Sequence, residues 1–296
     1  MQTKILITGG NGQLGRCLRE SLSCELPDAV VVSTDVDTLD VLKPDDVEAM
    51  LANGNFTYIV NCVAYTAVDR AENDFEAASA LNTRVPAILG HAAVRNNVKI
   101  IHISTDYVFP GTGTSPLKEN DLTGPATVYG ATKLAGEEAL MEATSGDAII
   151  IRTSWLYAAT SPSNFVKTML RLGLAGNQIR VVADQHGSPT NAEDLAHAIT
   201  AIIASGRWDA GVYHYANGGV STWYDLAKEA LRLAGIESNI TPITTDQYPT
   251  AAKRPSYSAL CLDKISSTYP EATIYEWRES LGRCIDKIKQ LNNKNS

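Results

Sequence analysis

The sequence has few cysteines and no long apolar run. Its five cysteines are widely spaced and include no Cys-x-x-Cys pair: Cys17, Cys24, Cys62, Cys261 and Cys284. An odd number at such spacings argues against a disulfide framework, so we expect reduced thiols and a cytoplasmic protein. No apolar stretch reaches the ~18 residues that a membrane span requires. We therefore expect neither a membrane segment nor an export signal.

An excess of basic residues is also missing. The formal net charge is −8 over 296 residues, which argues against a broad nucleic-acid surface but allows local capture of a small anionic ligand. The five histidines show no metal-ligand spacing: His91, His102, His186, His197 and His214. We therefore predict no metal site from them and no nucleic-acid partner.

A glycine-rich turn follows a short apolar strand predicted at residues 4–8 and precedes a helical pattern. Two registers fit it. Gly10, Gly12 and Gly15 give Gly-x-Gly-x-x-Gly, while Gly9, Gly12 and Gly15 give Gly-x-x-Gly-x-x-Gly. Glycines let the backbone approach a pyrophosphate, whose charge backbone N–H groups at the helix start can meet. The alternative is a plain turn, but the strand–turn–helix order favours a dinucleotide site.

The type of dinucleotide stays open between NADH and NADPH. Asp35 follows a strand predicted at residues 29–34, about twenty residues after the last glycine, where a carboxylate binds a ribose diol and favours NAD. It can equally be a loop aspartate. Arg16, just inside the first helix, offers a guanidinium for a 2′-phosphate instead. Asp40 is a candidate neighbour of the adenine.

Strands and helices alternate through the first half of the chain. Apolar strands are predicted at residues 4–8, 29–34, 58–63, 98–105 and 148–152. This alternation indicates an α/β fold with a Rossmann-type, doubly wound parallel sheet. We assign residues 1–152 to an NAD(P)-binding domain, to which a later segment, about 178–204, returns. Residues 153–296 form mainly a smaller, interleaved substrate-binding domain, with a disordered polar tail at 291–296.

Small and polar residues follow the third predicted strand. Ala64 and Thr66 lie where open parallel sheets bind ligands, and they leave room for a cofactor. A long helix is predicted from Asp74 to Asn97, and Asn82 interrupts its apolar face. Either the Asn82 amide bonds to a neighbouring backbone, or it supports a water molecule of an active site.

A tyrosine and a lysine four residues apart, Tyr129 and Lys133, lie one turn apart on a predicted helix. There the ammonium lowers the phenol pKa and eases proton delivery to a carbonyl under reduction. Alone, this spacing is more often structural. A preceding nucleotide site and the hydroxyls of Ser104 and Thr105, which end the fourth strand, change that balance. The irregular loop at 109–125 is long enough to cover a site.

Together, the segments at 9–15, 40–41, 104–109 and 129–133 resemble the extended short-chain dehydrogenase/reductase family. The segments at 61–72, 152–157 and 184–190 are similar to its dTDP-4-dehydrorhamnose reductases, and the Arg254-Pro255 segment extends that resemblance. Relatives acting on other nucleotide 4-keto-sugars share many of these motifs. A subunit of this fold that binds NADP without turnover is the less favoured alternative.

This resemblance implies hydride transfer from NADPH or NADH to C4 of a dTDP-linked 4-keto-6-deoxy sugar. Tyr129 would donate the proton, Lys133 would bind the nicotinamide ribose, and Thr105 would hydrogen-bond the keto oxygen. The expected cofactor residues are Gly9, Gly12, Gln13, Leu14, Gly15, Asp35, Asp40, Val41, Ala64, Tyr65, Thr66, Tyr129 and Lys133. The expected substrate residues are Thr105, Asp106, Trp155, Asn164 and Arg254. Trp155 can also be a core residue.

Some members of the family bind Mg²⁺ between subunits through glutamates. Glu193 occupies one such position, but Cys17 stands where another ligand is expected, and no glutamate matches near Lys289. A carboxylate at a helix start is the better interpretation of Glu193. We therefore expect no bound metal and a monomer or a weak homodimer.

Overall fold

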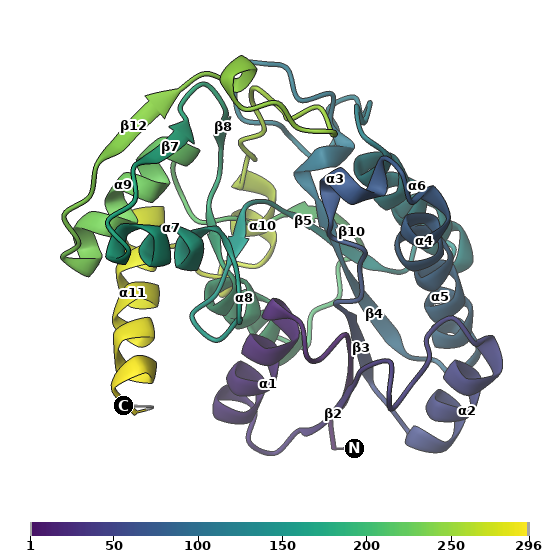
Figure 1. Ribbon diagram of the computed structural model, residues 1–296. Helices are drawn as coiled ribbons and strands as arrows, with labels where there is room; N and C mark the ends of the chain where they lie inside the picture. The colour runs from purple at the N-terminus through teal and green to yellow at the C-terminus, as the bar shows by residue number, and fades with distance from the viewer. Residues whose placement is uncertain (1, 295–296) are drawn as a thin grey trace.

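The computed structural model describes residues 2–294 and is built around one parallel sheet (Figure 1). Its strands are β1 (Lys4–Thr8), β2 (Val30–Thr34), β3 (Tyr58–Asn61), β4 (Lys99–Thr105), β5 (Ile149–Thr153) and β10 (Gly211–His214). They lie in the order β10-β5-β4-β3-β1-β2, and every neighbouring pair is parallel. The predicted α/β, doubly wound sheet is confirmed.

Helices cover both faces of this sheet. Helices α1 (Gln13–Glu25) and α8 (Ala192–Ala204) pack on one face, and α2 (Pro44–Gly54), α5 (Val85–Arg95) and α6 (Val128–Ala143) on the other (Figure 1). Side chains of β1 alternate between the two cores. Ile5 and Ile7 pack with α1 and α8, whereas Leu6 packs with α2 and α5. Because both faces are buried, the strands are apolar throughout.

The topology places a ligand site beside β1. The chain passes from β1 to β2 on one side and then to β3 on the other. At such a reversal of strand order the connections leave in opposite directions, and a crevice opens beyond the carboxyl ends of the strands. The glycine turn after β1 and the loop after β3 both end at this crevice.

The long helix predicted from Asp74 to Asn97 is present but not uniform. It comprises α4 (Phe75–Ser79), the π-helical turn η1 (Ala80–Arg84) and α5, after the short helix α3 (Val68–Ala71). The π turn contains Asn82, the residue that interrupts the apolar pattern. Such turns are frequent at functional sites.

A second lobe packs against the carboxyl edge of the sheet. It consists of α7 (Phe165–Leu174), β7 (Ile179–Val182), α9 (Trp223–Ala234), β12 (Ile240–Ile243) and α11 (Trp277–Lys294). It has apolar cores of its own, and β7 pairs with β12. The short elements are η2 (Asp106–Val108), β6 (Leu156–Tyr157), β8 (His186–Gly187), β9 (Thr190–Asn191), β11 (Ser221–Thr222), η3 (Thr245–Gln247) and α10 (Asp263–Thr268).

The structure corrects part of the expected return of residues 178–204. Helix α8 packs on α1 and the large sheet, but β7 belongs to the second lobe. The reason is local: Arg180 of β7 is exposed between buried neighbours, and a strand of the central sheet would have to bury both faces. Strand β10, which lies beyond residue 204, pairs with β5 instead.

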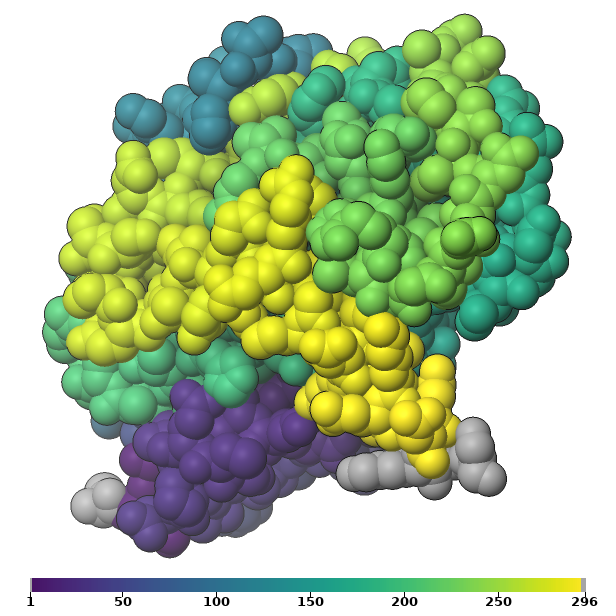
Figure 2. Space-filling model, turned by 90° about the vertical axis from the view of Figure 1, so that its left-hand side faces the viewer, coloured from purple at the N-terminus to yellow at the C-terminus, as the bar shows by residue number. Residues whose placement is uncertain are grey.

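The predicted disordered tail is wrong for residues 291–294, because α11 continues to Lys294. Ile288 and Leu291 pack into the second lobe and hold the helix there. The helix also approaches the amino-terminal region, where Lys287 pairs with Glu20 at 2.9 Å (Figure 2). Residues 295–296 lie outside the described residues. Across residues 2–294, no helix has the length and apolar character to cross a bilayer.

Candidate active site

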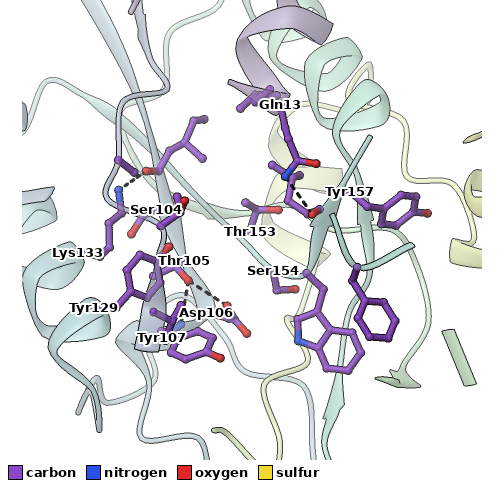
Figure 3. Close-up of a pocket in the computed structure, with 18 of the residues that line it drawn as sticks. Gln13, Ser104, Thr105, Asp106, Tyr107, Tyr129, Lys133, Thr153, Ser154 and Tyr157 are labelled. Carbon is purple, nitrogen blue, oxygen red and sulfur yellow. Dashed lines mark hydrogen bonds between the residues drawn. The ribbon is translucent and has the colours of Figure 1, made fainter. Parts of the chain in front are cut away.

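A cleft of about 520 Å³ opens between the carboxyl edge of the sheet and the second lobe (Figure 3). Most residues predicted to bind cofactor or substrate line it: Gly12, Gln13, Leu14, Gly15, Ala64, Thr66, Thr105, Asp106, Tyr129, Lys133, Trp155 and Arg254. A neighbouring cavity of about 400 Å³ shares residues with the cleft and is lined by Gly9, Asp35, Asp40 and Val41. Together they form an elongated site of the kind that dinucleotides occupy.

Two glycines of the turn after β1 stand where a side chain would not fit. Gly9 has a φ of +70°, which side chains rarely adopt, and this favours the glycine register that begins there. A Cβ on Gly15 would lie 2.4 Å from the carbonyl oxygen of Gly9. Gly12 is the N-cap of α1, whose first turn carries no acidic side chain. The backbone N–H groups of this helix end can therefore receive a pyrophosphate.

Both groups that bear on cofactor choice bond to the glycine turn, and Asp35 also lines the second cavity. The Asp35 carboxylate accepts a hydrogen bond from the backbone N–H of Asn11 at 3.0 Å. The Arg16 side chain donates to the carbonyl of Asn11 at 2.8 Å. A ribose diol and a 2′-phosphate would each find a partner here. Asp40 and Val41 line the same cavity, and the place of Asp40 beside the adenine stays a prediction.

The loop after β3 is fixed by Asn82 from the π turn. The Asn82 Oδ1 accepts from the backbone N–H of Tyr65 at 2.8 Å, and its Nδ2 donates to the Tyr65 carbonyl at 3.2 Å. The first of the two interpretations, an amide bonded to backbone, is therefore confirmed. The Tyr65 hydroxyl donates to Asp74 at 2.9 Å, and Tyr65 does not line the cleft. Its neighbours Ala64 and Thr66 do.

Helix α6 delivers Tyr129 and Lys133 into the cleft from its first two turns (Figure 3). The helix is capped by Thr127, whose hydroxyl accepts from the backbone N–H of Gly130 at 3.0 Å. Gly130 lets the helix approach η2 closely, since a Cβ there would lie 2.2 Å from the carbonyl oxygen of Tyr107. The Tyr107 and Tyr129 rings consequently meet edge to face at 5.6 Å.

Burial shifts the pKa values of the two residues in opposite directions. It raises the pKa of the Tyr129 phenol, while the nearby Thr105 hydroxyl lowers it. It lowers the pKa of Lys133 to about 8, and the negative charge of Glu137 counteracts this shift. Both shifts favour the neutral forms, as expected when charge is removed from water. A phenol that keeps its proton until an alkoxide forms suits a general acid.

Thr105 and Asp106 form a hydrogen-bonded pair at the end of β4. The Thr105 hydroxyl donates to the Asp106 carboxylate at 3.1 Å and accepts from the backbone N–H of Tyr107 at 3.2 Å. Burial raises the pKa of Asp106 to about 6, although the nearby hydroxyls of Ser258 and Thr105 lower it. Thr105 and Tyr129 therefore face the same part of the cleft, as the resemblance implies (Figure 3).

The second lobe faces this group with two stacked tryptophans. Trp155 and Trp223 lie 3.7 Å apart and nearly parallel, at 10°, and both line the cleft. Trp155 has a φ of +47°, a strained conformation for a bulky residue that is typical of functional sites. Gly187 makes room for it, because a Cβ there would lie 2.5 Å from the indole ring. Trp155 is thus at once a packed residue and a wall of the cleft.

Of the other two predicted substrate residues, Arg254 and Asn164, only Arg254 lines the cleft. Arg254 lines the cleft, forms an ion pair with Asp69 and donates to the Tyr107 hydroxyl at 3.1 Å. Asn164 does not line the cleft. It caps α7 and donates to the side chain of Gln13 at 3.2 Å, one hydrogen bond behind the cleft.

Glu193 lies in the first turn of α8, where a carboxylate is stabilised by the helix dipole. Its carboxylate pairs with Lys287 at 3.1 Å, and Lys287 also pairs with Glu20. Within residues 2–294 no cluster of three or more His, Cys, Asp or Glu side chains is arranged to hold a metal ion. An ammonium group therefore already neutralises Glu193.

The sequence matches the family described as the RmlD substrate binding domain over residues 3–290. The chain belongs to this family. It is 38% identical to the dTDP-4-dehydrorhamnose reductase of Mycolicibacterium smegmatis, over 97% of this chain and 86% of the relative. It is 41% identical to a probable dTDP-4,6-dihydroxy-2-methyloxan-3-one 4-ketoreductase of Streptomyces antibioticus, over 96% and 95% of the two chains.

A solved structure is also similar. The dTDP-4-dehydrorhamnose reductase of Bacillus anthracis in complex with NADP has 34% identity and a TM-score of 0.91, covering 97% of this chain and 100% of that one. This RmlD-family protein therefore shares its full architecture with an NADP-binding reductase. The Rossmann fold and the nicotinamide-cofactor class predicted from the sequence are confirmed.

Several residues of this family member's site escaped the sequence analysis. Trp223 reaches the site from a distant segment, and no local pattern marks it. Asp69 lies in the segment at 61–72, but its ion pair with Arg254 depends on how distant segments pack. Asn61 and His102 did leave a signal, because each is a polar residue within an apolar strand. Their positions are directly paired in neighbouring strands, a contact that becomes visible once strand register is known.

Proposed function

We propose that this protein is an NAD(P)H-dependent dTDP-4-dehydrorhamnose reductase that reduces the C4 keto group of dTDP-4-dehydro-L-rhamnose to give dTDP-L-rhamnose. One observation carries the proposal: Thr105, Tyr129 and Lys133 converge in a single cleft that begins at a glycine-lined helix end. A non-catalytic NADP-binding subunit would have no need of all three. The relatives named as reductases support the same assignment.

The residues present fit a nicotinamide dinucleotide. A Cβ on Gly9 or Gly15 would press against the backbone of Cys62 or of Gly9, so glycine keeps this turn tight, and the amino end of α1 carries no competing carboxylate. Gln13 and Thr66 continue this wall toward Lys133 in the cleft. When bound there, the reduced cofactor supplies the hydride.

The protein's own residues supply the proton and stabilise the developing charge. Thr105 orients the keto oxygen by a hydrogen bond, and Tyr129 transfers its phenolic proton as that oxygen becomes an alkoxide. An ammonium form of Lys133 then stabilises the tyrosinate that remains. These interactions act mainly in the transition state, so their loss reduces kcat more than it weakens binding.

The second lobe and Arg254 would hold the nucleotide sugar. The guanidinium group presents a fork of donors that suits a diphosphate, and its ion pair with Asp69 keeps it at the cleft in the absence of substrate. The stacked Trp155 and Trp223 offer an aromatic surface to the sugar or the base. Asp106 is placed to accept hydrogen bonds from sugar hydroxyls.

The test follows nicotinamide absorbance after the purified protein is mixed with dTDP-4-dehydro-L-rhamnose, generated in situ, and NADPH or NADH. Oxidation of the cofactor, with dTDP-L-rhamnose identified as the product, is the expected outcome. Binding of both cofactors without oxidation would refute the assignment. The ratio of the two rates gives the cofactor preference.

A second candidate substrate follows from the Streptomyces antibioticus relative. By its name, that protein reduces a keto group in a dTDP sugar whose ring lacks one hydroxyl. The catalytic residues would be unchanged, and discrimination would rest on contacts to the missing hydroxyl. Comparing kcat/KM for the two 4-keto sugars, with and without a 2-hydroxyl, decides between them.

We also infer a cytoplasmic monomer or weak homodimer. All five cysteines are free in the structure, as suits a reducing compartment. The Glu193–Lys287 ion pair occupies a position where some relatives are expected to use a metal-bridged interface. Light scattering at increasing protein concentration, with and without Mg²⁺, tests this: a stable dimer that dissociates on chelation would overturn it.

A further inference from the structure

A row of buried polar side chains crosses the sheet and ends at Lys133. Thr8, Asn61 and His102 occupy paired positions on β1, β3 and β4, and each is fully buried. The His102 ring lies between Asn61 and Lys133: its Nδ1 is 3.0 Å from the Asn61 Nδ2, and its Nε2 is 3.2 Å from the Lys133 Nζ. The mechanism above makes no use of this row.

The orientation of the Asn61 amide is fixed by its surroundings. Its Oδ1 accepts from the Thr8 hydroxyl at 2.8 Å and from the backbone N–H of Val63 at 3.1 Å. Turning the amide over would direct its NH₂ group at the Val63 N–H, and two donors would then face each other. The Nδ2 of Asn61 therefore donates to the Nδ1 of His102, which must be unprotonated.

This fixes the proton on the other side of the ring. Burial holds the pKa of His102 well below its usual value, so the ring is neutral. A neutral imidazole with an unprotonated Nδ1 carries its proton on Nε2. That N–H is directed at the Lys133 Nζ. An ammonium group has no lone pair to accept it, whereas a neutral amine has one.

The remaining hydrogen bonds agree with a neutral amine. The Lys133 Nζ donates to the carbonyl of Ile103 at 2.6 Å. Glu137, the nearest carboxylate on α6, is already paired with Arg152 from β5 at 2.7 Å. The other groups facing Lys133 are the Cys62 thiol after β3 and the Tyr129 phenol, and burial raises the pKa of both, which keeps them uncharged.

We propose that His102 is a positioning residue that holds Lys133 as a neutral amine before the cofactor binds, and that cofactor binding is therefore coupled to proton uptake at Lys133. The second half rests on the proposed function. When Lys133 turns from His102 to a cofactor hydroxyl, it leaves the opposing N–H and takes up a proton from solvent.

The protons balance over the reaction. Tyr129 gives one proton to the substrate oxygen, and Lys133 gives one to the tyrosinate. Lys133 then takes up a new proton from solvent when the next cofactor molecule binds. One proton is consumed for each carbonyl reduced, as the reaction requires. His102 thus links loading of the cofactor to loading of the proton.

The first test needs neither cofactor nor substrate. In protein with ¹⁵N-labelled histidine, long-range ¹H–¹⁵N correlation spectra distinguish the two tautomers of His102, and a His102→Phe variant assigns its signals. We expect a protonated Nε2 in the parent at pH 7 to 8. A protonated Nδ1 would overturn the proposal.

Asn61→Asp provides a second variant that leaves both partners in place. A carboxylate at this position accepts a hydrogen bond from a protonated Nδ1, so the His102 tautomer should reverse and Lys133 should become an ammonium. The Lys133 titration is followed by ¹³Cε shifts in labelled lysine, assigned with Lys133→Met. We expect a midpoint below pH 8 in the parent and a rise of at least one pH unit in the variant.

A carboxylate also raises the Lys133 midpoint through its charge alone, so Asn61→Asp is repeated in the His102→Phe background. The rise should shrink there if His102 transmits it, and an undiminished rise would overturn the proposal. Should Asn61→Asp fail to fold, the parent tautomer decides the question.

The coupling is measured by calorimetric titration with NADPH, and in parallel with NADH, in buffers of different ionisation enthalpy near pH 8.5. The parent should take up close to one proton on binding, and His102→Phe clearly less. His91→Gln, a change at an exposed histidine on α5, is the matched control. Binding without proton uptake in the parent would refute the coupling, whereas failure of both cofactors to bind would count against the proposed function alone.

Discussion

Arg152 and Glu137 form a buried, bidentate ion pair one helical turn beyond Lys133. The guanidinium Nη2 lies 2.7 Å from the carboxylate Oε2 and its Nε 3.0 Å from Oε1, with both side chains only 5% exposed. The pair joins α6 to β5, and the guanidinium also packs over the Phe109 ring at 5.0 Å. It therefore fixes the helix that carries Tyr129, and the guanidinium offsets part of the Glu137 charge near Lys133.

Removing one partner of this pair should be costly. Glu137→Gln leaves the Arg152 charge buried and unpaired, so we expect a loss of about 3 kcal/mol in the free energy of unfolding. Replacing both residues by methionine should recover most of it, because no buried charge then remains. Urea unfolding measures both effects. A Glu137→Gln loss of less than about 0.5 kcal/mol, the size of an ordinary surface change, would contradict this account.

What could be read from the sequence was local. The glycine turn and the Tyr129–Lys133 spacing each lie within one strand–turn–helix or one helix, where neighbours in sequence are neighbours in space. The Trp155–Trp223 stack and the Asp69–Arg254 pair depend on how distant segments pack, and no local pattern encodes that. Strand β7 was misplaced for a related reason: its apolar residues identify a strand, but only its partner decides which sheet it joins.

Tyr129→Phe should abolish most turnover while leaving the cofactor site intact. The change removes only the phenolic hydroxyl, the proposed proton donor, so we expect kcat to fall by roughly 10²- to 10⁴-fold. The dissociation constant for the cofactor, measured by fluorescence titration, should change by less than about threefold, well under 1.4 kcal/mol. Tyr248→Phe, at an exposed tyrosine, is the control and should leave both quantities unchanged. A Tyr129→Phe enzyme with the parent kcat would identify another residue as the acid.

Asp35 and Arg16 should shift cofactor preference in opposite directions. Asp35→Ala removes a carboxylate that we propose to bind the ribose diol and to repel a 2′-phosphate, so the NADPH to NADH ratio of kcat/KM should rise. Arg16→Ala removes the cation beside the glycine turn, so the NADPH to NADH ratio should fall. We expect about tenfold in each case, or 1.4 kcal/mol. If both variants moved the ratio in the same direction, the 2′ position of the cofactor's adenine ribose would not lie between Asp35 and Arg16.

Trp223→Ala should weaken substrate binding and leave the affinity for the cofactor unchanged. The change removes the face on which Trp155 stacks, so Trp155 loses its orientation and the aromatic wall of the cleft collapses. An aromatic pair of this kind contributes about 0.5–1.5 kcal/mol beyond burial, and we expect KM for the dTDP sugar to rise by roughly fivefold or more. Trp223→Phe keeps a ring, so its KM for the dTDP sugar should lie between those of the parent and of Trp223→Ala. Unchanged KM with a stably folded protein would show that the stack is structural only.

Asp106→Asn should stabilise the protein at neutral pH and impair it as an enzyme. Burial raises the pKa of Asp106 to about 6, so folding disfavours the carboxylate form. The resulting loss of stability is absent at low pH, where the group is protonated in both states, and grows as pH rises from about 4 through 6. A shift of about two pKa units bounds it at roughly 3 kcal/mol. The asparagine carries no such cost, although its carbonyl oxygen can still accept from Thr105.

Urea unfolding at pH 5 and pH 8 should therefore show a stabilising difference that increases with pH, together with a lower kcat/KM for the sugar. Asp28→Asn, at an exposed aspartate, should show no such pH dependence. A variant less stable than the parent at pH 8 would mean that hydrogen bonds to the Asp106 carboxylate outweigh its burial.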